Sequence, residues 1–523
     1  MAPDQREFVL TDATAAGSDV MRALTAAGEH SLGWANGRAV RSWRRLWLDT
    51  FDWRLYRAGL TLEQVTRGSQ AELVLTGRDG AVVATERLPS SRPNWPRLAG
   101  GLPAGPLQAA LEPVTGLRAL APVARASSKL AELHALNDDA KTIARLAVDR
   151  VSVTYPARAS LPARLTLVPV RGYQAQADKV SRAIGDLPGV LAGRDSVLEA
   201  VLAAAGRRPG EVTGKPSGIQ LAPGMPAGRA LSEILSGLLD AMDANVPGTL
   251  KDIDTEFLHD LRVAVRWTRS ALKLCGDALP RGLTREYAPE FRWLGDLTTP
   301  TRDFDVFLLG YPAMAASLVG ADADELIPFR DHLTRSRAAA YRRMVAGLRS
   351  ARFARLRVNW RAALADVRGS RRQTVAQLAD DKIAAAHRRT LHGGGTITPA
   401  SPPERLHDLR KRCKELRYLV EMFGSLHDPA QRWQAVRELK ALQDCLGEFQ
   451  DTEVQRMEIR AYAAQMMAER AAPAETLLAM GEIAASLAMA QATARAQFDG
   501  RFADFAGPAS RRRMAALART AAA

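Results

Sequence analysis

Polar and apolar residues alternate in short runs over the first 205 residues, whereas from residue 229 onward apolar residues recur at helical spacing. The short runs are separated by turn residues such as Arg78-Asp79-Gly80, which is typical of β-strands. The predicted strands cover residues 6–10, 44–49, 60–65, 71–75, 81–86, 147–155 and 163–170. Helical periodicity is present at residues 15–28 and 174–204. The pattern therefore predicts an α+β protein whose C-terminal part is all-helical.

Two segments rich in glycine and proline divide the chain. Residues 206–228 contain six glycines and four prolines, a composition typical of a linker. A second break at residues 393–403 separates the helical part into halves. We therefore predict an N-terminal domain at 1–205 and a helical domain at 229–515, with halves at about 229–392 and 401–515.

The helical part contains an internal repeat. Leu258–Gly276 recurs as Leu406–Gly424, 148 residues later, with seven of 19 positions identical. Asp254 is the predicted N-cap of the first copy, and Ser401–Glu404 is a predicted capping box for the second. The glycine that closes each copy is predicted to end its helix. Two similar helices at equivalent places in the two halves are therefore expected.

Basic residues gather on one side of each repeated helix. At 100° per residue those of the first copy fall within an arc of roughly 80°, beside an apolar stripe. They are His259, Arg262, Arg266, Arg269 and Lys273, and the second copy has His407, Arg410, Lys414 and Arg417. Such a row spans roughly 21 Å, which suits an extended polyanion better than one phosphate. A third row at heptad spacing consists of Arg335, Arg342 and Arg349.

The composition strengthens the case for an anionic ligand. The net charge is +15 and the pI about 10.1, and residues 335–389 hold 15 basic but only three acidic side chains. A field of this sign attracts nucleic acid, acidic lipid or phosphate chains. Two alternatives are a solvated arginine-rich surface and internal ion pairs. The acidic residues considered as internal partners are Asp296, Asp303, Asp444 and Asp451.

Other chemistry has little support in the sequence. No Walker loop, His-Glu-x-x-His or Cys-x-x-Cys motif is present, and the three cysteines occupy apolar helix positions. His259 and His407 lack nearby carboxylates at ligand spacing, so neither a metal site nor a cofactor is predicted. No apolar run approaches about 18 residues, and no secretory signal is recognised, so we expect no membrane span and a cytoplasmic location. No obligate protein partner is inferred.

The repeated motif His-x-x-Arg-x-x-x-(Arg/Lys)-x-x-Arg, at 259–269 and 407–417, resembles the CHAD family of conserved-histidine α-helical domains. Thr301–Val306 and Leu442–Asp451 extend the resemblance. It implies two four-helix bundles related by a pseudo-two-fold axis, with basic helices lining a groove that binds inorganic polyphosphate. The carried-over groove residues are His259, Arg262, Arg266, Arg269, His407, Arg410, Lys414 and Arg417.

The N-terminal part resembles a degenerate CYTH domain, of the triphosphate tunnel class. The resemblance lies in Leu48–Leu62, Pro122–Arg125 and Ala147–Arg150, and it implies an antiparallel β-barrel that encloses a tunnel. The family's metal-holding Glu-x-Glu-x-Lys strand corresponds to Asp4–Phe8, where only Glu7 is retained. We therefore expect the fold without its catalysis.

These observations together predict a non-catalytic protein that binds inorganic polyphosphate, with polyphosphate granules as its expected place of action. One alternative is a metal-dependent triphosphatase or polyphosphatase; loss of tripolyphosphate turnover in Glu7→Gln would favour it. That enzyme would use Glu7, Arg54, Arg57, Arg125 and Lys129. The other alternative is a nucleic-acid binder, which is disfavoured because only 6% of residues are aromatic and Trp267 lies off the basic arc.

Overall fold

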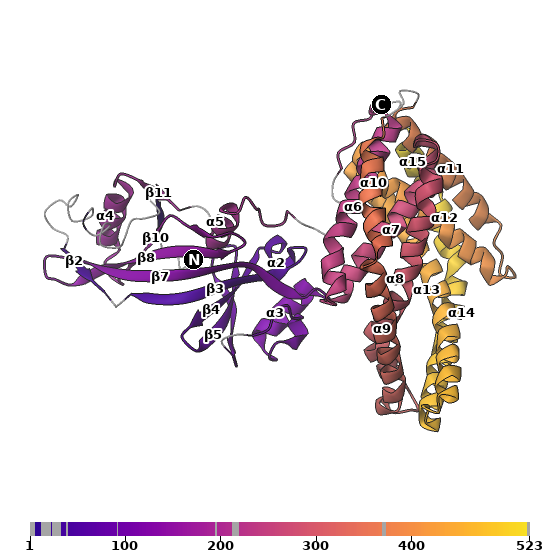
Figure 1. The fold of residues 1–523 in the computed structure, drawn as a ribbon, viewed down its shortest axis with the longest axis horizontal. Coiled ribbons are helices and arrows are strands. Elements are labelled where there is room, and N and C mark those ends of the chain that lie inside the picture. Colours follow the sequence, from indigo (N-terminus) through magenta and orange to yellow (C-terminus); the bar gives the residue numbers. More distant parts are fainter. Residues whose placement is uncertain are drawn as a thin grey trace. The chain divides into compact units, whose positions relative to one another are not determined.

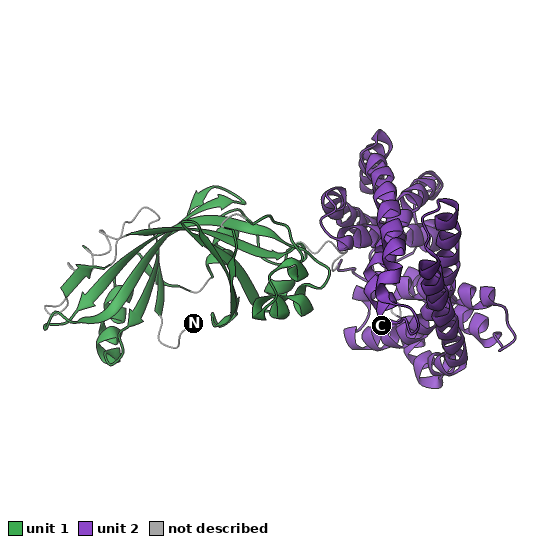
Figure 2. Cartoon of the chain, turned by 90° about the horizontal axis from the view of Figure 1, so that it is seen from below, with its two compact units in different colours: residues 1–213 green, residues 214–523 purple. Residues whose placement is uncertain are grey.

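The chain folds as two compact units, Met1–Thr213 and Gly214–Ala523 (Figure 2). The computed structural model describes residues 6–11, 22, 33–37, 40–90, 93–193, 196–211, 219–368 and 373–519. The predicted helix at 15–28 lies outside the described residues apart from residue 22, and so does the 212–218 part of the predicted linker.

Unit 1 is built on one antiparallel sheet of eleven strands, ordered β11-β1-β10-β8-β7-β3-β4-β5-β6, with β2 paired to β7 and β9 to β8 (Figure 1). The strands are β1 Arg6–Leu10, β2 Gly33–Asn36, β3 Arg41–Thr50, β4 Leu60–Arg67, β5 Gln70–Gly77, β6 Val82–Leu88, β7 Leu120–Leu136, β8 Thr142–Tyr155, β9 Ala159–Ser160, β10 Arg164–Pro169 and β11 Val190–Ala192. The sheet is strongly curved (Figure 2), but no ladder among the described strands joins β6 to β11. The predicted closed barrel is therefore corrected to an open sheet.

All seven predicted strands are present, but the longest strand was missed. Strand β7 has 17 residues and lies between β3 and β8 at the middle of the sheet. Its sequence is rich in alanine, serine and leucine, so strand propensity does not identify it. Strand β7 is instead stabilised by pairing along both of its edges with the long strands β3 and β8.

Short helices cover both faces of this sheet. They are α2 Arg54–Arg57, α3 Pro106–Thr115, α4 Gln174–Gly185 and α5 Val197–Ala203, with the 3₁₀ turn η1 at Ala99–Gly101. In β8, Val148 belongs to the core with α4, whereas Val151 belongs to the core with α5. Side chains alternate between the two faces along a strand, and positions 148 and 151 are an odd number of residues apart. The two cores therefore lie on opposite sides of the sheet. The predicted helix at 174–204 is thus two helices, interrupted by β11.

Unit 2 is all-helical in its described residues. Its helices are α6 Ala227–Leu250, α7 Thr255–Cys275, α8 Leu283–Ala316, α9 Ile327–Leu348, α10 Ala351–Ala365, α11 Val375–Gly395, α12 Pro403–Met422, α13 Pro429–Ala468, α14 Ala474–Ala506 and α15 Pro508–Leu517. Short 3₁₀ turns are η2 Gly276–Ala278, η3 Ala323–Leu326 and η4 Gly424–Leu426. The predicted α+β class is therefore correct.

The repeat comprises five helices per half. The 148-residue offset that relates α7 to α12 also carries the start of α6, Ala227, onto the start of α11, Val375. Helix α11 therefore opens the second repeat, and the division falls before it. The predicted halves, 229–392 and 401–515, wrongly placed α11 in the first half because the glycine run at its end resembled a boundary.

Two backbone hydrogen bonds reveal a local pseudo-two-fold axis. The Ala227 amide donates to the Gln373 carbonyl, and the Val375 amide donates to the Met225 carbonyl, at 3.0 and 2.8 Å. The 148-residue offset carries Met225 onto Gln373 and Ala227 onto Val375, so the two hydrogen bonds are equivalent with the two segments exchanged. The segments that precede α6 and α11 thus pair symmetrically around Pro226 and Thr374.

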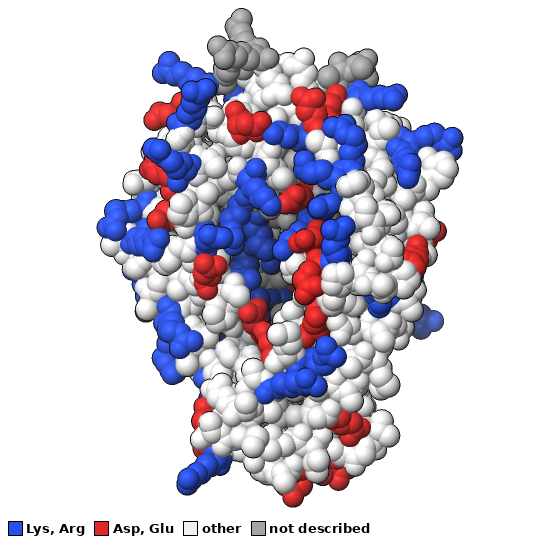
Figure 3. Space-filling view, turned by 90° about the vertical axis from the view of Figure 1, so that its right-hand side faces the viewer, with Lys and Arg blue, Asp and Glu red and all other residues white. Residues whose placement is uncertain are grey.

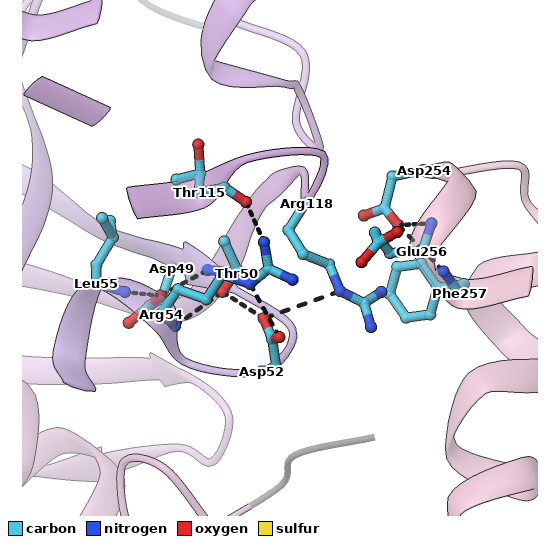
Figure 4. Close-up of polar contacts among 10 residues, drawn as sticks. All are labelled: Asp49, Thr50, Asp52, Arg54, Leu55, Thr115, Arg118, Asp254, Glu256 and Phe257. Atoms are coloured by element: carbon cyan, nitrogen blue, oxygen red, sulfur yellow. Dashed lines mark hydrogen bonds and ion pairs between the residues drawn. The ribbon is translucent and has the colours of Figure 1, made fainter. Parts of the chain in front are cut away.

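The ends of the repeated helices differ from their sequence signals in two respects. Asp254 caps α7 as predicted, because its carboxylate accepts from the amides of Glu256 and Phe257 (Figure 4). The predicted capping box at Ser401 is wrong: Pro402 is the N-cap residue and no side chain caps α12. Gly276 has φ −63°, and an added Cβ would lie 2.6 Å from the Thr284 hydroxyl, so it is needed for close packing and not for a left-handed turn.

The two repeats share their cores. One large cluster contains residues from both, with Leu261 and Leu409 as equivalent members. A second cluster joins α8 and α9 to α13 and α14, with Phe307 and Ile459 among its buried members. Two self-contained four-helix bundles would have separate cores, so that detail of the prediction is replaced by one intertwined domain of two five-helix repeats.

Among the described helices, α14 is long and apolar enough to cross a membrane by length and composition alone. Its most apolar 18-residue window has a mean hydropathy of 1.3. One such helix is weak evidence for a span. Helix α14 packs along α13 and contributes Met480 and Ile483 to the second core, so the expectation of no membrane span remains a prediction.

Candidate polyanion site

A cavity of about 940 Å³ lies between α7, α8 and α12 of the helical unit. Six basic side chains line it: Arg266, Arg269, Lys273, Arg292, Lys411 and Lys414. Asp296 and Glu415 are the acidic members of the wall. One face of the unit is hollowed, and Lys and Arg side chains gather in the hollow (Figure 3). The three helices thus direct basic side chains to one place.

The repeat explains how the centre of this cavity forms. Helix α7 buries Leu261 and Val265 in the shared core, which leaves Arg266 exposed one step around the helix. Lys414 is the equivalent of Arg266 in α12, 148 residues later. The charge of Arg266 contributes to lowering the pKa of Lys414, so the two equivalent cations lie near one another. The pseudo-symmetry of the repeats therefore brings two positive charges together, instead of placing an acidic side chain beside each one.

Most of the cavity's charge has no internal counter-ion. Arg266, Arg269, Arg292 and Lys414 have no acidic side chain within 4.0 Å among the described residues. Lys273 donates to Glu415 at 2.6 Å, and Lys411 lies 3.5 Å from Asp408. The cavity is therefore a cationic site that an external anion can complete.

Lys414 shows the electrostatic cost of this arrangement. Burial, followed by the charge of Arg410, lowers the pKa of the Lys414 ammonium to about 8, although Asp451 acts in the opposite direction. A lysine with a pKa near 8 is partly neutral at slightly alkaline pH. An anion bound beside it would favour the protonated form, so binding and protonation are coupled.

Arg262 lies beside the cavity and is held by α8. Its Nη1 donates to the Gly295 carbonyl at 3.2 Å and to the hydroxyls of Thr298 and Thr299 at 3.1 and 2.8 Å. Its Nε is buried and has no hydrogen-bond partner in the part of the chain that the structure describes, and burial together with Arg266 lowers the pKa of Arg262 to about 10. Arg262 therefore strengthens the field in the cavity without lining it.

Three of the equivalent basic residues of the second repeat have partners of their own. Arg410 donates to Asp451 at 2.8 Å, so the alternative of an internal ion pair is correct for this residue. His407 hydrogen-bonds Gln450 through Nδ1, and Arg417 lies 3.9 Å from Glu421. None of these three residues lines the cavity, and neither does half-buried His259 of α7.

Comparison with known proteins identifies the helical unit. Residues 233–460 match the family described as CHAD domain. This segment is a CHAD domain. None of the curated proteins matches the chain.

Three solved structures are similar to parts of the chain. The CHAD domain from the plant Ricinus communis is 23% identical, with TM-score 0.46, covering 55% of this chain and 95% of that one. PptA from Streptomyces chartreusis is 16% identical, with TM-score 0.43, covering 53% and 99%. A candidate adenylate cyclase from Bacillus halodurans is 12% identical, with TM-score 0.26, covering 37% and 94%.

The third predicted row of the CHAD domain lies away from the cavity. Arg335 and Arg342 are exposed on α9, and exposed Arg349 is the residue that ends it. None of the three lines the cavity. Much of the surrounding basic segment is neutralised by acidic residues distant in sequence, as in the pairs Arg337–Asp252 and Arg357–Asp243. The charge excess of residues 335–389 therefore does not mark the site.

Two cationic residues of the cavity were missed from the sequence. Arg292 lies on α8 and Lys411 on α12. The short connection between α7 and α8 was a usable signal for Arg292, because it indicates an antiparallel pair of helices. In that pair Arg262 contacts Thr298, and the antiparallel register then sets Arg292 alongside the middle of α7. Lys411 lies off the basic arc of α12, so only the position of α7 beside α12 reveals it.

Unit 1 uses its carboxylates in ion pairs with arginines. Arg164 donates to Glu7 at 3.3 Å, and Arg45 binds Glu63 at 2.5 Å and reaches Asp149 at 3.4 Å. Burial raises the pKa of Asp149, which Arg45 and Ser128 oppose. Across the described residues, no group of three or more His, Cys, Asp or Glu side chains is placed to hold a metal ion.

The residues of the alternative triphosphatase site are not assembled in unit 1. Arg54 donates to Asp52 at 3.0 Å and to the Thr115 carbonyl at 2.6 Å, and so fixes the turn after β3 (Figure 4). Arg57 donates to the Gly210 carbonyl. Arg125 lines a separate cavity of about 550 Å³, whereas Lys129 and Glu7 do not.

Proposed function

We propose that the CHAD domain binds inorganic polyphosphate, without catalysis, in the cavity between α7, α8 and α12. The single observation that supports this most is the convergence on one cavity of four cations that have no acidic side chain within 4.0 Å among the described residues: Arg266, Arg269, Arg292 and Lys414. Membership of the CHAD family, which is associated with polyphosphate, supports the same ligand.

The repeated negative charges of a phosphate chain match the several cations of the cavity. A phosphate chain carries one negative charge per unit, so several cations in a row bind it cooperatively. Arginine donates in a planar fork to phosphate oxygens, whereas lysine acts as a mobile point charge. A compact trianionic or divalent ligand would leave several of the cavity's cations without a partner.

The proposal of a non-catalytic role extends to unit 1. Glu7, the one acidic residue retained from the tunnel-enzyme strand, accepts from Arg164. Glu63 is likewise held by Arg45. We propose that the protein acts in the cytoplasm, at polyphosphate granules, as a binding protein.

Salt dependence tests this proposal. Fluorescently labelled polyphosphate titrated into the full chain should bind with an affinity that falls steeply between 50 and 200 mM salt. A slope of about −4 in log Kd⁻¹ against log salt is expected if six cations act, at about 0.7 per contact on a single strand. Single-stranded DNA of equal charge should compete weakly. Absence of saturable binding near 0.15 M salt, or preferential binding of DNA, would contradict the proposal.

The pKa of Lys414 predicts a pH dependence of binding. Since the ammonium of the free protein titrates near pH 8 and bound phosphate raises its pKa, affinity should be constant below about pH 7 and decline above pH 8. The decline can reach at most tenfold per pH unit for one proton. Titrations of long polyphosphate from pH 6.5 to 9.5 measure it, and Lys414→Arg should flatten the profile. An equally steep decline in that variant would show that another group is responsible.

A further inference from the structure

One wall of the basic cavity is apolar. Ala288, Pro289, Trp293 and Leu297 of α8 and Tyr418 of α12 line the same space as the cations. A chain of inorganic phosphate presents only charged oxygens, which gain nothing from contact with hydrocarbon or an indole ring. The apolar wall therefore indicates a ligand in which the anionic chain carries an aromatic or apolar group.

Trp293 is held rigidly enough to be a stacking surface. The guanidinium of Arg352 lies 4.3 Å from the centre of the ring and is fixed by hydrogen bonds of 2.8 and 2.9 Å to Glu290. Arg352 does not line the cavity, so the part of the indole that faces the cavity is not the part that Arg352 covers. A fixed aromatic ring loses little conformational entropy when a ligand stacks against it.

Asp296 is the second feature that a bare phosphate chain does not explain. Its exposed carboxylate lines the cavity and has no basic side chain within 4.0 Å among the described residues. A free carboxylate repels phosphate but accepts hydrogen bonds from hydroxyl and amino groups. The Tyr418 hydroxyl has no hydrogen-bond partner in the described part of the chain either. The cavity thus offers polar contacts to the non-phosphate part of a ligand.

We propose that this cavity binds nucleoside polyphosphates, with the base against Trp293, the ribose hydroxyls near Asp296 and the phosphates on Arg266, Arg269 and Lys414. The inference rests on the proposed function, because it uses the same cations for the phosphate chain. A volume of about 940 Å³ is within the range of small-molecule sites, about 300–1,000 Å³. The domain would then recognise both free phosphate chains and phosphate chains attached to a nucleoside.

The test compares two ligands that have the same number of phosphates. ATP and inorganic tripolyphosphate are titrated calorimetrically into the full chain without divalent ions, at equal ionic strength. ATP is expected to bind about tenfold more tightly, since stacking of a base on an aromatic ring contributes a factor of about five to more than 100 in affinity. Trp293→Leu should bring the ratio of the two affinities close to one. Trp433→Leu is the matched control, because Trp433 is exposed on α13 and does not line the cavity.

Each outcome separates the inference from the proposed function. Tripolyphosphate that binds as tightly as ATP would overturn the inference and leave phosphate-chain binding intact. Failure of both these ligands and long polyphosphate to bind would overturn the proposed function as well. A single-stranded oligonucleotide that binds more tightly than ATP would identify nucleic acid as the occupant and contradict the proposal. A ratio that stays high in Trp293→Leu would remove Trp293 as the stacking residue and with it the proposed geometry.

Discussion

Replacing Arg266 and Lys414 together by alanine is expected to weaken polyphosphate binding about 100-fold. The two residues are equivalents in the repeat, both line the cavity, and neither has an acidic partner among the described residues. Each charge-assisted contact contributes about 1.5 kcal/mol or more, and about 1.4 kcal/mol is a factor of ten in affinity. The slope of affinity against salt should also become less negative by about 1.4 for two lost contacts.

The matched control for this experiment removes the same charge outside the cavity. Arg335 and Arg342 are exposed on α9 and do not line the cavity, so Arg335→Ala with Arg342→Ala should change affinity less than twofold. Circular dichroism of both variants checks that the helices are intact. An equal loss in the two variants would mean that binding follows net charge and not the cavity.

Arg337→Ala is expected to destabilise the helical unit strongly while leaving polyphosphate affinity nearly unchanged. Arg337 donates to Asp305 at 2.6 Å and makes two bonds of 2.7 Å to Asp252. Asp305 is 1% exposed, and burial raises its pKa although Arg337 opposes that shift. Removing Arg337 leaves a buried carboxylate without its partner, which costs about 3–5 kcal/mol. The melting temperature should fall by roughly 5–10 °C.

A second substitution shows whether the buried charge is the cause. Asp305→Asn in the Arg337→Ala background should recover part of the lost stability, because an amide is less costly to bury than an ion. The single variant should also regain stability as the pH falls, since protonation of Asp305 removes the uncompensated charge. Arg342→Ala, on the same helix but exposed, is the control with little expected effect. Unchanged melting of Arg337→Ala would show that these ion pairs are not structural.

These two experiments distinguish a segment that is rich in basic residues along the sequence from a cavity where basic residues gather in space. Residues 335–389 carry the largest charge excess along the chain, yet Arg337 is bound to Asp252 in the turn after α6, and Arg357 to Asp243 of α6. The cavity instead draws its cations from helices with ordinary local charge, as Arg292 shows. Charge counted along the sequence cannot reveal this, because the acidic partners of these arginines are 32 to 114 positions away in the sequence.

The sequence by itself determined the α+β class, the seven strands that were recognised, the 148-residue repeat and the amphipathic character of α7 and α12. These depend on local periodicity, which fixes the side of an element on which a residue lies. It also placed Arg266 and Lys414 at equivalent positions on the basic side of their helices, and both residues line the cavity. Only the tertiary structure decided that the two repeats share a core, that α11 opens the second repeat and that the sheet stays open among its described strands. It alone decided which cations converge and which are neutralised, because those outcomes depend on how helices pack against one another, and side-chain periodicity along one helix does not specify its neighbours.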